Sequence, residues 1–205
     1  MNFKTLWGYE LVDVCGLPDL LSAEDFDFFT ARKYAGDIRI PKELEAASAA
    51  IRNYCGWHLY PSLPCKLTMT MQDRRVTRTG VDLLIQLPAK YVTAVESVTI
   101  GGTEYEYTFE TNGILRVYDV CRHGRRDEVV VEYTAGLPKE MMGTINELAA
   151  HSSTRALASS GGVTNETAGG VSITYNANWV ANARATALPD DGKEALAPFR
   201  CQGVF

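Results

Sequence analysis

The residues that could do acid–base chemistry are few and scattered along the chain. Three histidines, His58, His123 and His151, lie far apart in the sequence. Adjacent carboxylates occur at predicted helix starts or in loops, as Glu24–Asp25, Asp127–Glu128 and Asp190–Asp191. Helix capping explains such pairs better than acid–base catalysis does. The sequence also has no nucleophile elbow, phosphate-binding glycine loop or zinc-protease motif, so we expect no catalytic residues and no enzyme activity.

Two of the histidines have a more specific local context. His123 lies in the basic segment 122–127, whose composition predicts a solvated hairpin tip. Contact of this tip with phosphate or with an acidic neighbour is the alternative. His58 follows Trp57 where a predicted helix gives way to strands, and we expect it to be a packing or capping residue.

The cysteines give no sign of a metal site or a disulfide framework. They are odd in number, widely spaced and never arranged as Cys-x-x-Cys: Cys15, Cys55, Cys65, Cys121 and Cys201. Zinc sites and disulfide scaffolds need closer or paired spacing. We therefore expect reduced, mostly buried thiols and no metal or other cofactor.

Composition narrows the possible function classes. The chain has 205 residues, 46% of them hydrophobic, which is enough for a core without disulfides. Its net charge of −5 argues against binding driven by nucleic-acid phosphates. No segment reaches the apolar length of a membrane span, and residues 1–10 lack a basic-then-apolar secretory pattern. We expect synthesis in the cytoplasm and no membrane partner.

A helix with unusually small side chains is predicted over residues 41–55. Pro41 suits a first helical position, and Gly56 suits a left-handed stop after Cys55. Residues 46–50 are all alanine or serine, which would let a neighbouring helix or subunit approach closely. The alternative is that alanine is simply the best helix former.

An earlier short helix and a long β-rich segment flank this helix. Ser22 reads as the N-cap of a helix that reaches about Tyr34. Alternating patterns predict strands at 67–71, 81–87, 95–100, 103–109, 114–118 and 128–133. Gly101–Gly102 and Asn112–Gly113 favour tight hairpin turns, so an antiparallel β-meander or barrel-like segment is expected over 61–136.

Helical spacing returns at residues 137–158, which predicts a second core helix packed on the first. The expected fold class is therefore α+β, a small helical bundle with an inserted β segment. In this organisation residues 1–60 supply the N-terminal helices of the bundle. Residues 159–205 form a flexible C-terminal arm, with a strand at 171–175 and a terminal helix at 190–200.

The strand in this arm has no strand partner nearby in the sequence. Val171–Tyr175 alternates apolar and polar residues, with Trp179 four residues later. Such a strand must pair with something distant, which leaves two alternatives. It pairs with another chain, or it folds back on an edge of the protein's own sheet.

Several of these segments together resemble the head–tail connector (adaptor, head completion) proteins of tailed bacteriophages. The likeness runs from Leu44 to Arg200 and rests on the order and spacing of five short segments. These are Ala46–His58, Leu84–Pro88, Val95–Val98, Val131–Pro138 and Gly170–Tyr175. The first of them resembles the end of the first core helix in that family.

The resemblance implies a virion structural protein at the junction of capsid and tail. Such a protein forms a ring, a dodecamer in the family, that docks on the portal and extends the DNA channel. It also offers a platform to stopper or tail-terminator proteins, while the genome passes without sequence-specific binding. The implied portal or inter-subunit contacts are Val171, Ile173, Tyr175, Trp179, Phe199 and Phe205. The implied ring-packing residues are Ala46, Ala47, Ala50, Ile51 and Trp57.

Two rival functions remain open from the sequence. One is a non-catalytic β-rich binding module of a cellular protein, which the tyrosine-rich strands favour. The other is an enzyme whose site forms only between subunits, which the scattered histidines disfavour.

Overall fold

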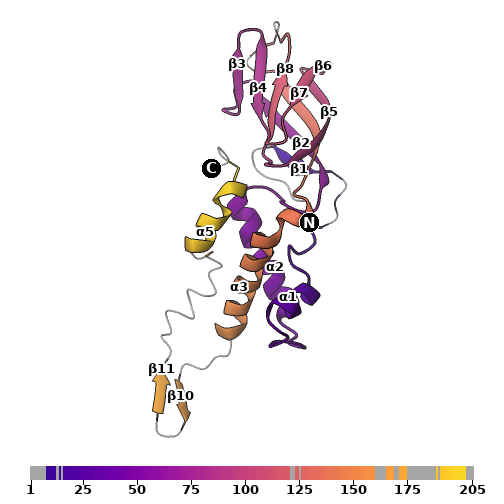
Figure 1. Cartoon of the computed structure of the whole chain (residues 1–205). Coiled ribbons are helices and arrows are strands. Elements are labelled where there is room, and N and C mark those ends of the chain that lie inside the picture. Colours follow the sequence, from indigo (N-terminus) through magenta and orange to yellow (C-terminus); the bar gives the residue numbers. More distant parts are fainter. Residues whose placement is uncertain are drawn as a thin grey trace. The chain divides into compact units, whose positions relative to one another are not determined.

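The chain divides into two compact units. The computed structural model describes residues 8–12, 14, 16–120, 123–124, 126–159, 165–168, 171–174, 188 and 190–201. We call residues 1–18, 55–141 and 198–205 the β unit, and residues 19–54 and 142–197 the helical unit. Figure 1 labels their elements.

A five-stranded antiparallel sheet forms one layer of the β unit. Its order is β1 (Tyr9–Leu11), β2 (Leu63–Thr70), β9 (Glu128–Ala135), β5 (Val92–Ile100) and β6 (Thr103–Glu104). Strands β2 and β9 pair over eight residues, from Leu63 opposite Ala135 to Thr70 opposite Glu128. Alternate residues of β9 are buried, as a sheet with one face on a core requires.

A four-stranded antiparallel sheet forms the second layer. Its order is β3 (Val76–Thr79), β4 (Asp82–Gln86), β8 (Ile114–Val117) and β7 (Tyr107–Phe109). The core of the β unit is made of aliphatic side chains from both sheets, each at most 1% exposed: Leu67, Val98, Val129, Val131, Leu83, Ile85, Leu115 and Val117.

The segment 103–109 belongs to both sheets. The amide of Tyr105 donates to the carbonyl of Val98, at 3.0 Å, which continues the β5–β6 pairing. The next residue changes sheets, because the carbonyl of Glu106 accepts from the amide of Tyr118 at 3.0 Å. The sequence predicted one strand over 103–109 within one meander, and the sheet change at this point corrects that prediction.

The helical unit contains α1 (Ala23–Phe29), most of α2 (Ile40–Cys55), α3 (Gly143–Ser159) and α5 (Asp190–Leu196). The Ser22 hydroxyl caps α1 by accepting from the amide of Asp25, at 3.0 Å. Helix α2 ends at Cys55, and the next residue, Gly56, has a φ of +81°, as the sequence predicts. A hairpin of β10 (Asn165–Ala168) and β11 (Val171–Thr174) follows α3. Two 3-10 turns lie at Lys139–Met141, in the β unit, and Ala197–Phe199.

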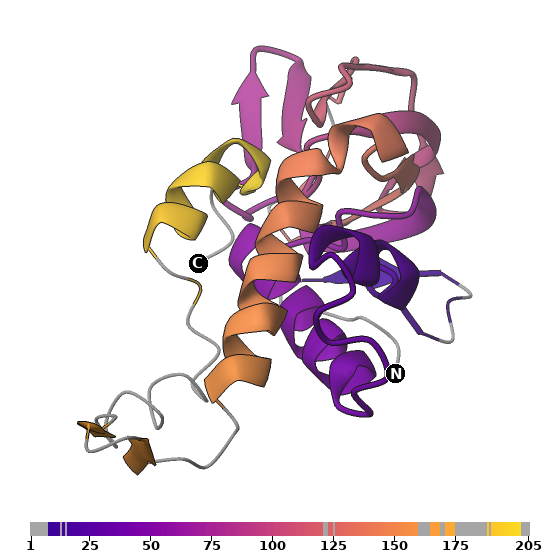
Figure 2. The same cartoon turned by 60° about the horizontal axis from the view of Figure 1, so that its bottom comes forward.

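Helices α2 and α3 lie side by side (Figures 1 and 2). The hydroxyl of Ser153 donates to the carbonyl of Glu43, at 3.3 Å, which joins the two helices. The hydroxyl of Ser48 accepts from the amide of Leu20, at 2.9 Å, and so holds the segment before α1. The core of the helical unit consists mainly of aliphatic side chains: Leu21, Phe26, Leu44, Ile51, Ile145, Ala149, Leu157 and Leu196. Within the described residues, no helix is long and apolar enough to cross a bilayer.

The predicted fold class is wrong. The described residues hold nine strands in two antiparallel sheets, with a separate hairpin, against four short helices. The chain is therefore β-rich and is not a helical bundle with an inserted β segment. The error arose because pairing between distant strands leaves little local signal: β1 comes from the N-terminal segment, and β2 pairs with β9 more than 50 residues away.

Candidate interaction surfaces

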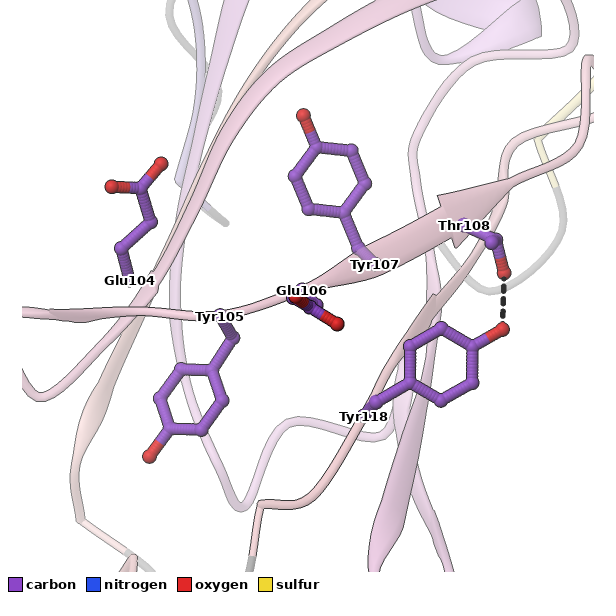
Figure 3. A pocket seen from close by; sticks show the side chains of 6 residues that line it. All are labelled: Glu104, Tyr105, Glu106, Tyr107, Thr108 and Tyr118. Atoms are coloured by element: carbon purple, nitrogen blue, oxygen red, sulfur yellow. Dashed lines mark hydrogen bonds between the residues drawn. The ribbon is translucent and has the colours of Figure 1, made fainter.

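The corner where the chain changes sheets carries a tyrosine-rich hollow. Its volume is about 640 Å³, and it is wide open to solvent. The lining comes from β6, β7, the two residues between them and the residue after β8: Glu104, Tyr105, Glu106, Tyr107, Thr108 and Tyr118. Figure 3 shows Tyr105 and Tyr107 on opposite sides of the strand, with Glu106 between them.

Hydrogen bonds and a cation–π contact fix the tyrosines of this hollow. The Tyr107 hydroxyl donates to the carbonyl of Val95, at 2.7 Å. The hydroxyls of Thr108 and Tyr118 are hydrogen-bonded at 2.8 Å (Figure 3). The guanidinium of Arg116 lies 5.5 Å from the centre of the Tyr118 ring. Aromatic rings that are fixed in this way beside carboxylates are suited to contacts with a partner protein, above all with its lysine or arginine side chains.

His123 is held by two partners and is not a solvated loop residue. Its side chain is 12% exposed, and its Nδ1 lies 2.8 Å from Oδ2 of Asp127. A carboxylate only accepts, so Nδ1 carries the hydrogen of this bond, and Nε2 is hydrogen-bonded to the hydroxyl of Tyr105. The amide of Gly124 also donates to Asp127, at 3.0 Å. The His123 and Gly124 hydrogen bonds hold the pKa of Asp127 below its usual range. These hydrogen bonds fasten His123 and Asp127 to the sheet corner.

The other two histidines have different settings. His58 is fully buried in the β unit, where its Nε2 donates to the carbonyl of Pro61, at 2.8 Å. That contact confirms a packing role. His151 lies on an exposed position of α3.

Among its described residues, the helical unit exposes three large apolar side chains. Phe28 is 85% exposed and Phe29 44%, both on α1, and their rings meet edge to face with centroids 6.4 Å apart. Ile38, just before α2, is 93% exposed. Exposed groups of large apolar residues mark interaction sites more often than single ones do. Nothing in the sequence singles these three residues out, because their exposure depends on what the fold leaves uncovered.

The predicted ring-packing residues divide by burial. Ala47, Ile51 and Trp57 are at most 4% exposed, whereas Ala46 and Ala50 are half-buried. The Trp57 indole also donates to the carbonyl of Phe199, at 2.8 Å, inside the β unit. The side chains of the three buried residues therefore make most of their contacts within the chain. Packing of this helix on a neighbouring subunit stays a prediction.

The predicted portal contacts are only partly described. Val171 and Ile173 lie in β11, which pairs antiparallel with β10, so the expectation of a distant strand partner is corrected to a local hairpin. Phe199 is half-buried, and the amide of nearby Cys201 donates to the carbonyl of Cys55, at 3.0 Å. Tyr175, Trp179 and Phe205 lie outside the described residues.

The described cysteines are buried and free. Desolvation raises the pKa of the Cys55, Cys65 and Cys201 thiols to about 12. Cys15 and Cys121 lie outside the described residues. Within the described residues, no three His, Cys, Asp or Glu side chains are grouped as a metal ion requires.

The comparisons with known proteins identify one family. A family model described as head completion protein matches residues 19–179, the larger part of the chain. A search of curated proteins gave no match.

Proposed function

Because the chain belongs to the head completion protein family, and is therefore a structural protein of the phage virion, we propose that it is the head-to-tail adaptor. In this role it forms a ring, a dodecamer by the family resemblance, that docks on the portal protein. The ring extends the DNA channel and receives the stopper or tail-terminator protein on its other side.

The observation that carries the proposal is the extent of the family match. Residues 19–179 include α1, α2, the hairpin strands β10 and β11 and most of the β unit. The match is thus to nearly the whole architecture and not to one short motif. The exposed Phe28, Phe29 and Ile38 support it further, because they give a surface that one chain leaves uncovered.

The surfaces in contact with the portal are proposed from the C-terminal part of the chain. The candidate residues are Val171, Ile173, Tyr175, Trp179, Phe199 and Phe205. Hairpin β10–β11 suits this role because its described strands pair with each other and join neither sheet of the β unit. A hairpin that is independent of the sheets can contact a partner without disturbing the core.

Contacts between copies are proposed to involve helix α2. Ala46 and Ala50 retain part of their surface, and their small side chains allow close helix approach. The net charge of −5 fits a channel wall along which DNA moves without adhering.

Light scattering on a sizing column tests the proposal. The purified protein is measured alone and after mixing with the portal protein of the same phage. A ring, or a complex formed only with portal, would support the adaptor role. A monomer that ignores portal at micromolar concentration would refute it.

A further inference from the structure

The sheet corner at residues 103–119 offers a partner its side chains and not its backbone. The amide of Tyr105 donates to the carbonyl of Val98 at 3.0 Å, and the carbonyl of Thr111 accepts from the amide of Val92 at 2.8 Å. Strand β5 therefore lies along one side of this segment, and β7 pairs with β8 on the other. Addition of a strand needs a free edge, so a partner at this corner must bind through the side chains.

The side chains of this corner are mainly acidic. Residues 103–119 contain four carboxylates against one arginine, and all four are exposed: Glu104, Glu106, Glu110 and Asp119. The arginine, Arg116, is already paired with Asp82 at 2.8 Å. The carboxylates of Glu104 and Glu106, which line the hollow, have no ion-pair or hydrogen-bond partner among the described residues. We call residues 103–119 the acidic corner, and its excess negative charge attracts a basic surface.

Tyrosine rings line the same hollow as these carboxylates (Figure 3). The chain itself supplies an example of the contact that such rings make, because the guanidinium of Arg116 lies 5.5 Å from the centre of the Tyr118 ring. The rings are already fixed, since the hydroxyl of Tyr118 is bonded to Thr108 and that of Tyr105 to His123. A partner that binds to fixed rings loses less free energy to the ordering of side chains.

The form of the hollow suits a segment of a protein better than a small molecule. Its volume of about 640 Å³ is that of many small-molecule pockets, but such pockets enclose most of their ligand, and this hollow is wide open. Phe109, which follows the lining residue Thr108, is 38% exposed and adds apolar surface beside it. Aromatic residues are enriched in protein–protein interfaces, and so is arginine, the side chain that these rings and carboxylates would bind.

We propose that the acidic corner binds a basic, extended segment of the tail-side partner, whose arginine or lysine side chains contact both the carboxylates and the tyrosine rings. This inference rests on the adaptor function proposed above and names the surface that receives the stopper or tail-terminator protein. The hairpin proposed for the portal belongs to the helical unit, whereas the acidic corner belongs to the β unit. The two partners would then use different units of the chain.

A fluorescent peptide of alternating arginine and glycine is the probe for the surface itself. E104Q/E106Q removes the two unpaired carboxylates of the hollow and should weaken peptide binding at least tenfold at low salt. E140Q/E147Q removes the same charge from two other exposed positions and should change the affinity less than twofold. Fluorescence anisotropy measures both, and urea unfolding midpoints check that both variants are folded. Equal losses would overturn the site, because they would show a general effect of net charge.

Two substitutions of Tyr118 separate its ring from its hydroxyl. Y118F keeps the ring and removes the bond to Thr108, so the affinity for the peptide should stay unchanged. Y118L removes the ring and should weaken binding roughly two- to fivefold, the range of an exposed cation–π contact. Equal affinities of the two variants would contradict a contact between the ring and the basic segment.

The tail-side protein of the same phage tests the named partner. It is mixed with adaptor and portal, and complexes are measured by light scattering on a sizing column. E104Q/E106Q should bind portal as the wild type does and lose the tail-side protein at least tenfold, whereas E140Q/E147Q should keep both. Unchanged binding of the tail-side protein to E104Q/E106Q overturns this inference and leaves the adaptor role standing. A wild-type monomer that ignores portal contradicts the adaptor role and, with it, the partner named here.

Discussion

Tyr9 donates a buried hydrogen bond from its hydroxyl to Nδ1 of His58, 49 residues further along the chain. The direction follows from the other ring nitrogen, because Nε2 must donate to the carbonyl of Pro61. Both side chains are fully buried. The bond fastens edge strand β1 to the segment that follows α2, so β1 is part of the β unit.

Removing the Tyr9 hydroxyl should destabilise the protein. Y9F leaves the buried Nδ1 of His58 without this donor, and an unsatisfied buried acceptor costs about 1–3 kcal/mol. Tyr133, also fully buried, is the matched control, because its hydroxyl has no hydrogen-bond partner among the described residues. Y133F should therefore leave the free energy of unfolding unchanged within about 0.5 kcal/mol, or raise it. Urea unfolding measures both, and equal losses would contradict the assigned bond.

Local features of the fold were predictable from the sequence. The end of α2 at Gly56, the Ser22 cap and the turn at Gly101–Gly102 depend on residues within a few positions of each other. Amphipathic spacing also predicted α3, whose buried face includes Ile145, Ala149, Ser153 and Leu157.

Other features of the fold and of the candidate surfaces depend on contacts between residues that are distant in the sequence. Tyr9–Leu11 is a three-residue strand, too short for an alternating pattern to be distinctive. The sheet change between Tyr105 and Glu106 leaves the alternation of 103–109 intact, so nothing local marks it. Of the candidate surfaces, the hollow combines residues from β6 to β8, and the exposure of Phe28 and Ile38 depends on what the fold leaves uncovered. Sequence spacing reveals neither.

The Asp73–Arg75 pair should make stability depend on acidic pH. The Asp73 carboxylate accepts from Nε and Nη2 of Arg75, at 2.8 and 2.7 Å, and these bonds lower the pKa of Asp73 below 3.8. A carboxyl with a lowered folded-state pKa stabilises the protein above its unfolded-state pKa. That stabilisation is lost as pH falls through the lower, folded-state value.

The variant D73N should remove this contribution. We expect a loss of about 1 kcal/mol at pH 7, small because Asp73 keeps 24% exposure to water, and a difference from wild type that shrinks below pH 4. Asp37 and Arg39 form a pair of the same spacing, whose hydrogen bonds lower the pKa of Asp37 to about 2, so D37N should show a deficit with the same sign of pH dependence. A D73N deficit that is unchanged at low pH would contradict the assignment. Urea titrations at pH 3 to 7 measure it.

The buried thiols should make stability fall in alkali. The pKa values of Cys55, Cys65 and Cys201 are raised from 9.0 to about 12 on folding. Their contribution is complete below pH 9 and is lost as pH rises from 9 towards 12, because only the unfolded chain ionises readily. In native protein at pH 8 these three thiols should not react with a disulfide reagent, and all should react in urea. Rapid native labelling of Cys65, located by mass spectrometry, would contradict the buried assignment.

The β10–β11 hairpin should affect docking more than folding. We expect I173D/Y175D to block binding to portal and to leave the thermal midpoint unchanged, since β11 pairs only with β10 among the described strands. S172D, in the same strand, is the matched control, because successive strand residues point to opposite sides. Loss of several degrees in the midpoint of I173D/Y175D would instead mark these residues as core. Sizing-column light scattering and calorimetry give the two readouts.

The exposed apolar residues of the helical unit should be dispensable for folding and needed for assembly. Phe28 and Ile38 lose little water-accessible surface on folding, so F28S/I38S should change the free energy of unfolding by less than about 0.5 kcal/mol. If a neighbouring subunit or the portal covers them, the same double variant removes apolar surface buried in that contact, and assembly should weaken at least tenfold. M141S is the matched control, because Met141 is 45% exposed and lies in the β unit. Unchanged assembly of F28S/I38S would show that these side chains stay in water within the ring. The interface between copies would then have to lie elsewhere, with α2 as the proposed site.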